Sequence, residues 1–457
     1  MAEQIPGYIQ SNTPNPPENR APWYKNTAPT YAGIFLWFVF WNQIATLGLR
    51  EAGLGICMVA LLVSALICHY LFYLVPGLLG MKTGRPLYII GTSTFGAVGG
   101  FLMPGFLMGL LQFGWLGVNT FFASTFIVEV LSHKVTRFPD AVLTMVCILW
   151  GLGAAFVGLK GIHYVARVAT YLPLIPLAIL LIMLFKVGFF AGSFHPATDN
   201  PAVVNAKAWL AIISYVVGFF ATAGAAGVDF GMNNRNARDV KRGGLVGISL
   251  AIVVSAGIPL VVVAGAHAMQ IPGITSFVFT DVMQVVLGAK LGGVFMLALT
   301  LASFPPACFS SFIAANSFKT TLPKVNPFVS VGLGAIFSIL IAAFGWAGNL
   351  GAMFGLIGAS FGPICGAMVV DYFMAKMSWP GPRAGFNIPG WIAWLAGFIV
   401  GILPNEALVR WGITNPGQFS GLEPAPVIAF VVGAVIYFVF AKLGLQSRTL
   451  PLVETKS

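Results

Sequence analysis

The chain has 457 residues, of which 58% are hydrophobic and only 8% are charged, and its mean hydropathy is +0.89. Soluble globular proteins carry about 25% charged residues, so this composition excludes a water-soluble globular fold and predicts a polytopic membrane protein. The formal net charge of +11 would, taken alone, also fit a nucleic-acid partner, and the positions of the charged residues decide between the two interpretations.

Apolar stretches long enough to cross about 30 Å of hydrocarbon, which takes about 20 helical residues, recur from Tyr31 toward the C-terminal end. They follow a polar segment, residues 1–30, that is rich in Pro, Asn and Thr. The twelve stretches cover residues 31–49, 52–79, 97–131, 139–159, 165–190, 207–228, 241–268, 287–317, 326–346, 351–375, 387–405 and 424–444. We therefore expect an all-α membrane protein with twelve transmembrane helices.

The Lys and Arg residues predict the orientation of these helices, because cytoplasmic loops carry an excess of positive charge. With the N-terminus in the cytoplasm, 17 of the 24 basic residues fall in cytoplasmic segments. The acidic residues divide so that the cytoplasmic side holds the whole net charge of +11. This pattern predicts a multi-pass protein of the cell inner membrane with both termini in the cytoplasm, in contact with anionic lipid and not with nucleic acid.

The motifs of the common enzyme and channel classes are missing from the sequence. It has no GxxxxGK phosphate-binding loop, no HExxH and no GxSxG, and no filter motif or ring of charges typical of a channel. The five cysteines show no metal-ligand spacing. We therefore expect a transporter rather than an enzyme. We also expect a monomer that needs no cofactor other than Na⁺ as a coupling ion.

Polar residues within the third apolar stretch are candidates for a binding site, because polar groups inside a membrane are costly. Gln112, Trp115 and Asn119 are spaced so that they lie on one helical face. Two amides and an indole could hydrogen-bond to and stack on a flat polar ligand. The alternative is that the amides tie neighbouring helices together.

The sixth stretch combines Phe219, Phe220 and Thr222 with several glycines. We expect its helix to be interrupted between Gly218 and Gly224, which would expose backbone groups to a ligand beside an aromatic platform. The alternative is that the glycines allow close packing of neighbouring helices.

The eighth and first stretches also carry polar residues. Thr300 and Ser303 precede two prolines, and hydroxyls beside carbonyls freed by proline suit an alkali cation; they could instead bond to their own helix. Asn42 and Gln43 are adjacent amides in the first stretch, so only one of them is expected to point inward. Asp229 and Asp371 end their stretches and are interpreted as cytoplasmic connectors.

Three segments resemble nucleobase:cation symporter family one, and within it the bacterial cytosine permeases. Residues 82–119 contain KTG, TFG and a Gln-x-x-Trp-Leu-Gly element. Residues 226–237, AGVDFGMNNRNA, resemble the family's ADF or PDF stretch with a basic segment nearby. Residues 358–373, GASFGPICGAMVVDYF, resemble its PP-x-x-G-x-x-x-x-DY element. The resemblance extends from the second to the eleventh stretch in the family's order.

The resemblance implies a leucine-transporter-like fold of two inverted five-helix repeats with two peripheral helices. In this chain the parts would be a cytoplasmic tail (1–30), a first repeat (31–190), a second repeat (207–375), peripheral helices 11 and 12 (387–444) and a C-terminal cytoplasmic tail (445–457).

The resemblance also implies roles for the candidate residues. A base would stack between Trp115 and Phe220, with Gln112, Asn119, Phe219 and Thr222 around it. Na⁺ would lie between Thr300, Ser303 and carbonyl groups near Trp37 and Phe40. Phe304 and Pro305 depart from the family pattern, which leaves Na⁺, protons or no coupling open.

The predicted function is import of a nucleobase, cytosine or a purine, by alternating access with a cation. Hydantoin or allantoin, thiamine and pyridoxine-like rings are alternative substrates, and an uncoupled channel or sensor is an alternative function.

Overall fold

A computed structural model describes residues 5–132, 140–169, 171–196 and 201–451. Its secondary structure in these ranges is helical, with two isolated β-bridges and no strand. The α-helices are α1 (Gly7–Gln10), α2 (Thr27–Leu36), α3 (Phe38–Trp41), α4 (Leu54–Ile67), α5 (Leu74–Thr83), α6 (Leu87–Phe95), α7 (Leu107–Ser132), α8 (Ala141–Lys160), α9 (Ile162–Ala169), α10 (Leu174–Val187), α11 (Pro201–Ala225), α12 (Gly227–Gly231), α13 (Ala237–Gly244), α14 (Ala251–Ala268), α15 (Phe279–Leu287), α16 (Ala289–Thr321), α17 (Pro327–Ala343), α18 (Leu350–Met374), α19 (Ile388–Ile402), α20 (Glu406–Arg410) and α21 (Ala425–Lys442). The predicted all-α architecture is confirmed.

Within the described ranges, nine helices are long and apolar enough to cross a membrane. They are Leu54–Thr83, Phe101–Ser132, Ala141–Lys160, Leu174–Ser193, Asn205–Ala225, Ala237–Ala268, Ala289–Thr321, Leu350–Met374 and Ala425–Lys442. The predicted stretches 326–346 and 387–405 correspond to shorter apolar helices, Pro327–Ala343 and Ile388–Ile402. The exact number of twelve crossings stays a prediction.

The first predicted stretch is a broken helix. α2 ends at Leu36, Trp37 has an extended backbone (φ −63°, ψ 122°), and α3 begins at Phe38. Side chains donate hydrogen bonds to backbone carbonyl groups near the break. Trp41 Nε1 donates to Leu36 O at 3.1 Å, and Tyr215 Oη donates to Val39 O at 3.1 Å. The break needs no glycine, because an extended conformation is open to any residue.

The predicted interruption of the sixth helix is wrong. α11 runs without a break through Gly218 and Gly224, and the helix is interrupted only at Ala226, before α12. A Cβ on Gly218 would lie 2.6 Å from Phe354 O, and one on Gly224 would lie 2.7 Å from Phe72 Cβ. The glycines therefore serve close helix packing, the alternative drawn from the sequence.

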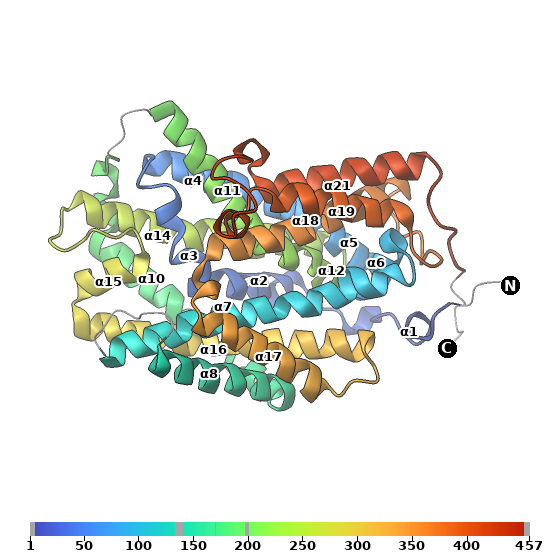
Figure 1. Ribbon diagram of the computed structural model, residues 1–457, viewed down its shortest axis with the longest axis horizontal. Helices are drawn as coiled ribbons and strands as arrows, with labels where there is room; N and C mark the ends of the chain where they lie inside the picture. The colour runs from blue at the N-terminus through green and yellow to red at the C-terminus, as the bar shows by residue number, and fades with distance from the viewer. Residues whose placement is uncertain (1–4, 133–139, 170, 197–200, 452–457) are drawn as a thin grey trace.

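In Figure 1, α18, α19 and α21 lie at the upper right of the molecule, and α7, α8, α16 and α17 lie along the bottom. α18 packs against α11, α19 and α21, while α7 packs against α8, α16 and α17. α1 and the segment after α21 lie at the same end, where Ile9, Ile89, Ala97, Ala384 and Leu450 form a small apolar cluster. This arrangement places the middle of α7 between the broken first helix, α11 and α18.

Candidate functional site

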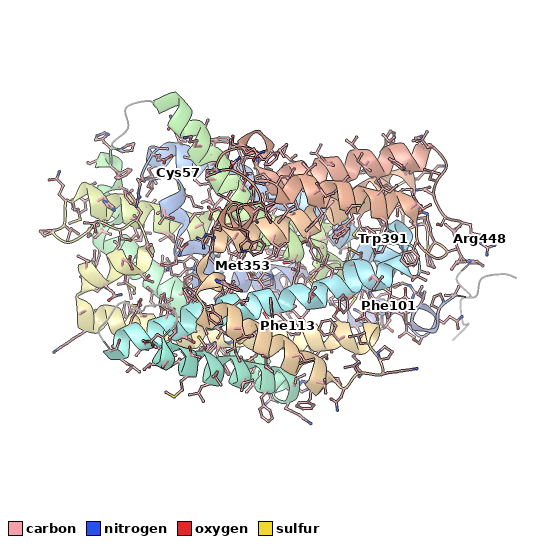
Figure 2. All side chains as sticks on the ribbon, viewed as in Figure 1. Cys57, Phe101, Phe113, Met353, Trp391 and Arg448 are labelled. Carbon is pink, nitrogen blue, oxygen red and sulfur yellow. The ribbon has the colours of Figure 1, made fainter. Side chains whose placement is uncertain are left out.

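An aromatic cluster occupies the junction of these four elements. The ring of Trp115 in α7 lies 5.9 Å from that of Trp37 at the helix break, 5.2 Å from Phe219 in α11 and 5.5 Å from Phe354 in α18, measured between centroids. Trp115 is 9% exposed and Phe219 is 2% exposed. Met353, labelled in Figure 2, marks where α18 crosses α7, since its Cε would lie 3.0 Å from a Cβ on Gly114.

In this closed structure the phenylalanine that faces Trp115 is Phe219, and not Phe220, which was predicted to stack with it. Phe219 faces Trp115, whereas Phe220 is fully buried against Tyr31 and Phe35, each with centroids 5.7 Å away. Consecutive helical residues point about 100° apart, so the two phenylalanines cannot face the same ring. The sequence identified this pair of residues, and the assignment of the stacking role to Phe220 stays a prediction.

Gln112 lies one helical turn before Trp115 and is 7% exposed. The one contact described for its amide is a long one, from Nε2 to Met108 Sδ at 3.7 Å. A sulfur atom is a weak acceptor. The amide therefore keeps most of its hydrogen-bonding capacity for another group.

Asn119, by contrast, is committed to helix packing. Its Nδ2 donates to Ser303 O at 2.8 Å, and its Oδ1 accepts from Trp150 Nε1 at 3.0 Å. The amide joins α7 to α8 and α16, which agrees with the structural alternative drawn from the sequence. These two bonds hold α7 beside α8 and α16.

The other predicted substrate residues are only partly brought to the cluster. Asn42 Oδ1 accepts from Thr280 N at 3.0 Å and Asn42 O accepts from Phe279 N at 2.9 Å, so this residue holds the start of α15. Gln43 is half-buried after α3. Thr222 is 5% exposed, one turn from Phe219 in α11.

The predicted cation ligands lie on separate elements. In α16, Thr300 Oγ1 donates to Met296 O at 3.0 Å and Ser303 Oγ donates to Thr300 O at 2.7 Å. The carbonyl of Trp37 accepts from Phe40 N at 3.0 Å, and the Phe40 ring packs on Phe219 at 4.6 Å. Each hydroxyl donates to its own helix and keeps lone pairs that can accept or coordinate. These oxygens are chemically suited to an alkali cation, and no described contact joins the two groups.

The aromatic cluster is closed. A flat ring held between two aromatic faces needs about 7 Å between them, because carbon atoms in contact are about 3.5 Å apart. The edge-to-face packing of Trp115 and Phe219 at 5.2 Å leaves less than this. Binding of a flat ligand at Trp115 therefore requires Phe219, Phe354 or Trp37 to move aside.

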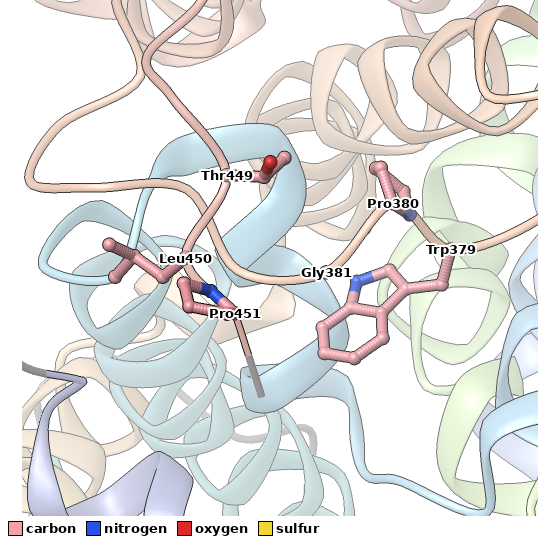
Figure 3. A pocket seen from close by; sticks show the side chains of 6 residues that line it. All are labelled: Trp379, Pro380, Gly381, Thr449, Leu450 and Pro451. Carbon is pink, nitrogen blue, oxygen red and sulfur yellow. The ribbon is translucent and has the colours of Figure 1, made fainter. Parts of the chain in front are cut away.

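Sequence inspection missed two features of the site and one remote cavity. Phe354 and the Trp37 side chain were not among the ring-contact candidates, because only the fold brings them to Trp115. A cavity of about 390 Å³ lies elsewhere, between the loop after α18 and the C-terminal segment (Figure 3), lined by Trp379, Pro380, Gly381, Thr449, Leu450 and Pro451.

Solved structures with the same fold cover nearly the whole chain. Mhp1, a nucleobase-cation-symport-1 family transporter in a closed conformation with bromovinylhydantoin bound, is 16% identical with a TM-score of 0.65, and the match covers 97% of each chain. The inward-facing conformation of Mhp1 is 17% identical with a TM-score of 0.62, covering 97% of this chain and 99% of the other. A Na⁺-coupled sialic acid symporter in a substrate-bound outward-open state is 15% identical with a TM-score of 0.55, covering 97% and 93%.

These matches confirm the predicted leucine-transporter-like fold class. No curated protein matches the chain. A family model described as permease for cytosine/purines, uracil, thiamine, allantoin matches residues 14–378. The chain is thus a multi-pass membrane transporter and not an enzyme, and it belongs to the family of permeases for cytosine/purines, uracil, thiamine and allantoin.

Proposed function

We propose that this permease imports a nucleobase, cytosine or a purine, across the cell inner membrane by alternating access, and that Na⁺ or H⁺ drives the import. The observation that carries the proposal is the placement of Trp115. Its ring lies at the helix break, faces Phe219, and has the uncommitted amide of Gln112 one turn away. Stacking plus an amide is the chemistry that recognises a flat, polar heterocycle.

The bound state would differ from this closed packing. Phe219 would leave its edge-to-face contact so that the base stacks on Trp115, while Gln112 hydrogen-bonds to an edge of the base. The family's described substrates are all nitrogenous ring compounds, and the closed Mhp1 structure holds a hydantoin derivative. Allantoin and thiamine remain the alternative substrates within the same family.

The coupling cation would be held by the oxygens of Thr300 and Ser303 together with backbone carbonyl groups near Trp37 and Phe40. The neighbouring Phe304 supplies no oxygen and packs on Trp150 with centroids 5.2 Å apart. With fewer hydroxyls available, a weak Na⁺ site or proton coupling both fit the residues present.

The test is a thermal-stability panel of the purified protein with nucleobases, allantoin and thiamine, each with and without Na⁺. A ligand at 100 times its Kd stabilises the native fold by about 2.7 kcal/mol, which gives a measurable shift in Tm. We expect a shift with cytosine or a purine, lost in Trp115→Ala. A shift confined to thiamine or allantoin, or none with any ring, contradicts the nucleobase assignment.

A further inference from the structure

The indole N–H of Trp37 differs from those of five other tryptophans in the described part of the chain. Its Nε1 is buried without a hydrogen-bond partner. Five other tryptophans donate Nε1 to an oxygen at 3.0–3.1 Å: Trp41, Trp150, Trp379, Trp391 and Trp394. A buried donor without an acceptor is costly, and native structures rarely keep one without a reason.

The helix break explains why this donor lacks a backbone partner. Trp37 is the residue with extended backbone between α2 and α3. The nearby carbonyl of Leu36 is taken by Trp41 Nε1, and the carbonyl of Trp37 itself accepts from Phe40 N. The break therefore places an indole in the aromatic cluster while its local acceptors are already used.

The surroundings of Trp37 match the proposed substrate site. Its ring meets Trp115 at 5.9 Å with a 63° interplanar angle and lies 6.4 Å from Phe219. An N–H directed at an aromatic face makes only a weak bond. A ligand that displaces Phe219 from Trp115 would enter beside this donor and could supply the missing acceptor.

We propose that Trp37 Nε1–H donates a hydrogen bond to a ring carbonyl oxygen of the substrate, which makes the protein selective for oxo-substituted bases. This assignment rests on the proposed function. It gives Trp37 a side-chain role in specificity, separate from any role of its carbonyl in cation binding. Trp115 would supply the stacking face, Gln112 an amide, and Trp37 the donor for the carbonyl group.

The test compares bases with analogues that lack the oxo group and the ring N–H that accompanies it: cytosine with 4-aminopyrimidine, and hypoxanthine with purine. Binding to the purified full-length protein is measured for wild type, Trp37→Phe and a variant with benzothienylalanine at position 37, which keeps the two-ring shape and lacks the N–H. Trp391→Phe is the control, because its Nε1 bonds to Phe95 O at 3.1 Å in another part of the fold.

We expect wild type and Trp391→Phe to prefer the oxo base, and both position-37 variants to lose about tenfold in affinity for it while binding the oxo-free analogue as before. Equal weakening of both ligands, or no change, overturns the role of Trp37 and leaves the nucleobase function standing. Failure of wild type to bind any of the four bases overturns the proposed function and this inference together.

Discussion

A buried ion pair at one end of α18 gives the sharpest stability prediction. Arg383 Nη1 lies 2.9 Å from Asp371 Oδ1, and the side chains are 6% and 2% exposed. Ser93 Oγ donates to Asp371 Oδ2 at 2.7 Å and Tyr437 Oη donates to Oδ1 at 2.8 Å. Arg383 also donates to the carbonyl of Ser93. The pair therefore joins α6, α18, α21 and the loop before α19.

Arg383→Met should leave the Asp371 carboxylate buried without its cation. Removing one partner of a buried pair costs about 3–5 kcal/mol, since the remaining charge is uncompensated. The double variant Asp371→Asn with Arg383→Met removes both charges and should be less destabilised than Arg383→Met alone. Arg235→Met is the matched control: Arg235 lies at the same 2.9 Å from Asp239 but is 51% exposed, so its loss should cost about 0–1 kcal/mol.

The assay is the free energy of unfolding in mixed micelles, measured by denaturant titration for wild type, the two single variants and the double variant. The expected order of stability places Arg235→Met near wild type and Arg383→Met lowest. This prediction would be refuted if Arg383→Met lowered the free energy of unfolding by less than about 1 kcal/mol. It would also be refuted if the double variant were less stable than Arg383→Met alone, because the two buried charges would then not be compensating each other.

Three further predictions concern other contacts. Asn119→Leu loses two hydrogen bonds between helices, so it should lower the free energy of unfolding by about 1–3 kcal/mol. Its binding constant for cytosine, measured by titration calorimetry, should equal that of wild type. Gly80→Ala should destabilise the protein strongly in the same unfolding assay, because the added Cβ would clash with the backbone oxygen of Val228. Gly153→Ala should be neutral or stabilising, because no atom lies within 4 Å of its added Cβ. Equal effects of the two substitutions would contradict the packing argument. Burial raises the pKa of Asp229 from 3.8 to about 6, so the native state binds the proton more tightly than the unfolded state. Its contribution favours folding at low pH and is lost as pH rises from about 4 to about 6; Asp229→Asn should flatten this part of the stability profile, and an unchanged slope would contradict it.

Hydropathy predicted the positions of the helices well, because lipid imposes long apolar segments that a sequence shows directly. The break at Trp37 has no comparable signal, since one extended residue needs neither glycine nor proline. The glycines of α11 were misinterpreted for a related reason. Glycine permits both a broken helix and a close crossing, and only the approach of Phe354 O to Gly218 decides between them.

Long-range partners explain the remaining differences. Asp371 was interpreted as a connector at a helix end, yet it is buried with Arg383 and with Ser93, which lies 278 positions away in the chain. Asn119 has the spacing of a ligand-binding residue, but its amide forms hydrogen bonds with α8 and α16. Spacing predicts which residues share a helical face, whereas the neighbouring helices determine whether a polar group remains available.

The central claim is that a nucleobase binds on Trp115, and gradient-driven uptake tests it most directly. Uptake of labelled cytosine and hypoxanthine is measured in proteoliposomes that contain wild type, Trp115→Ala or Trp346→Ala, under an imposed Na⁺ or pH gradient. Trp346→Ala is the control, because Trp346 is 66% exposed. The account predicts concentrative uptake of at least one base by wild type and Trp346→Ala and background uptake by Trp115→Ala. Uptake by Trp115→Ala at the level of wild type would contradict this account. So would the absence of concentrative uptake by wild type under both gradients.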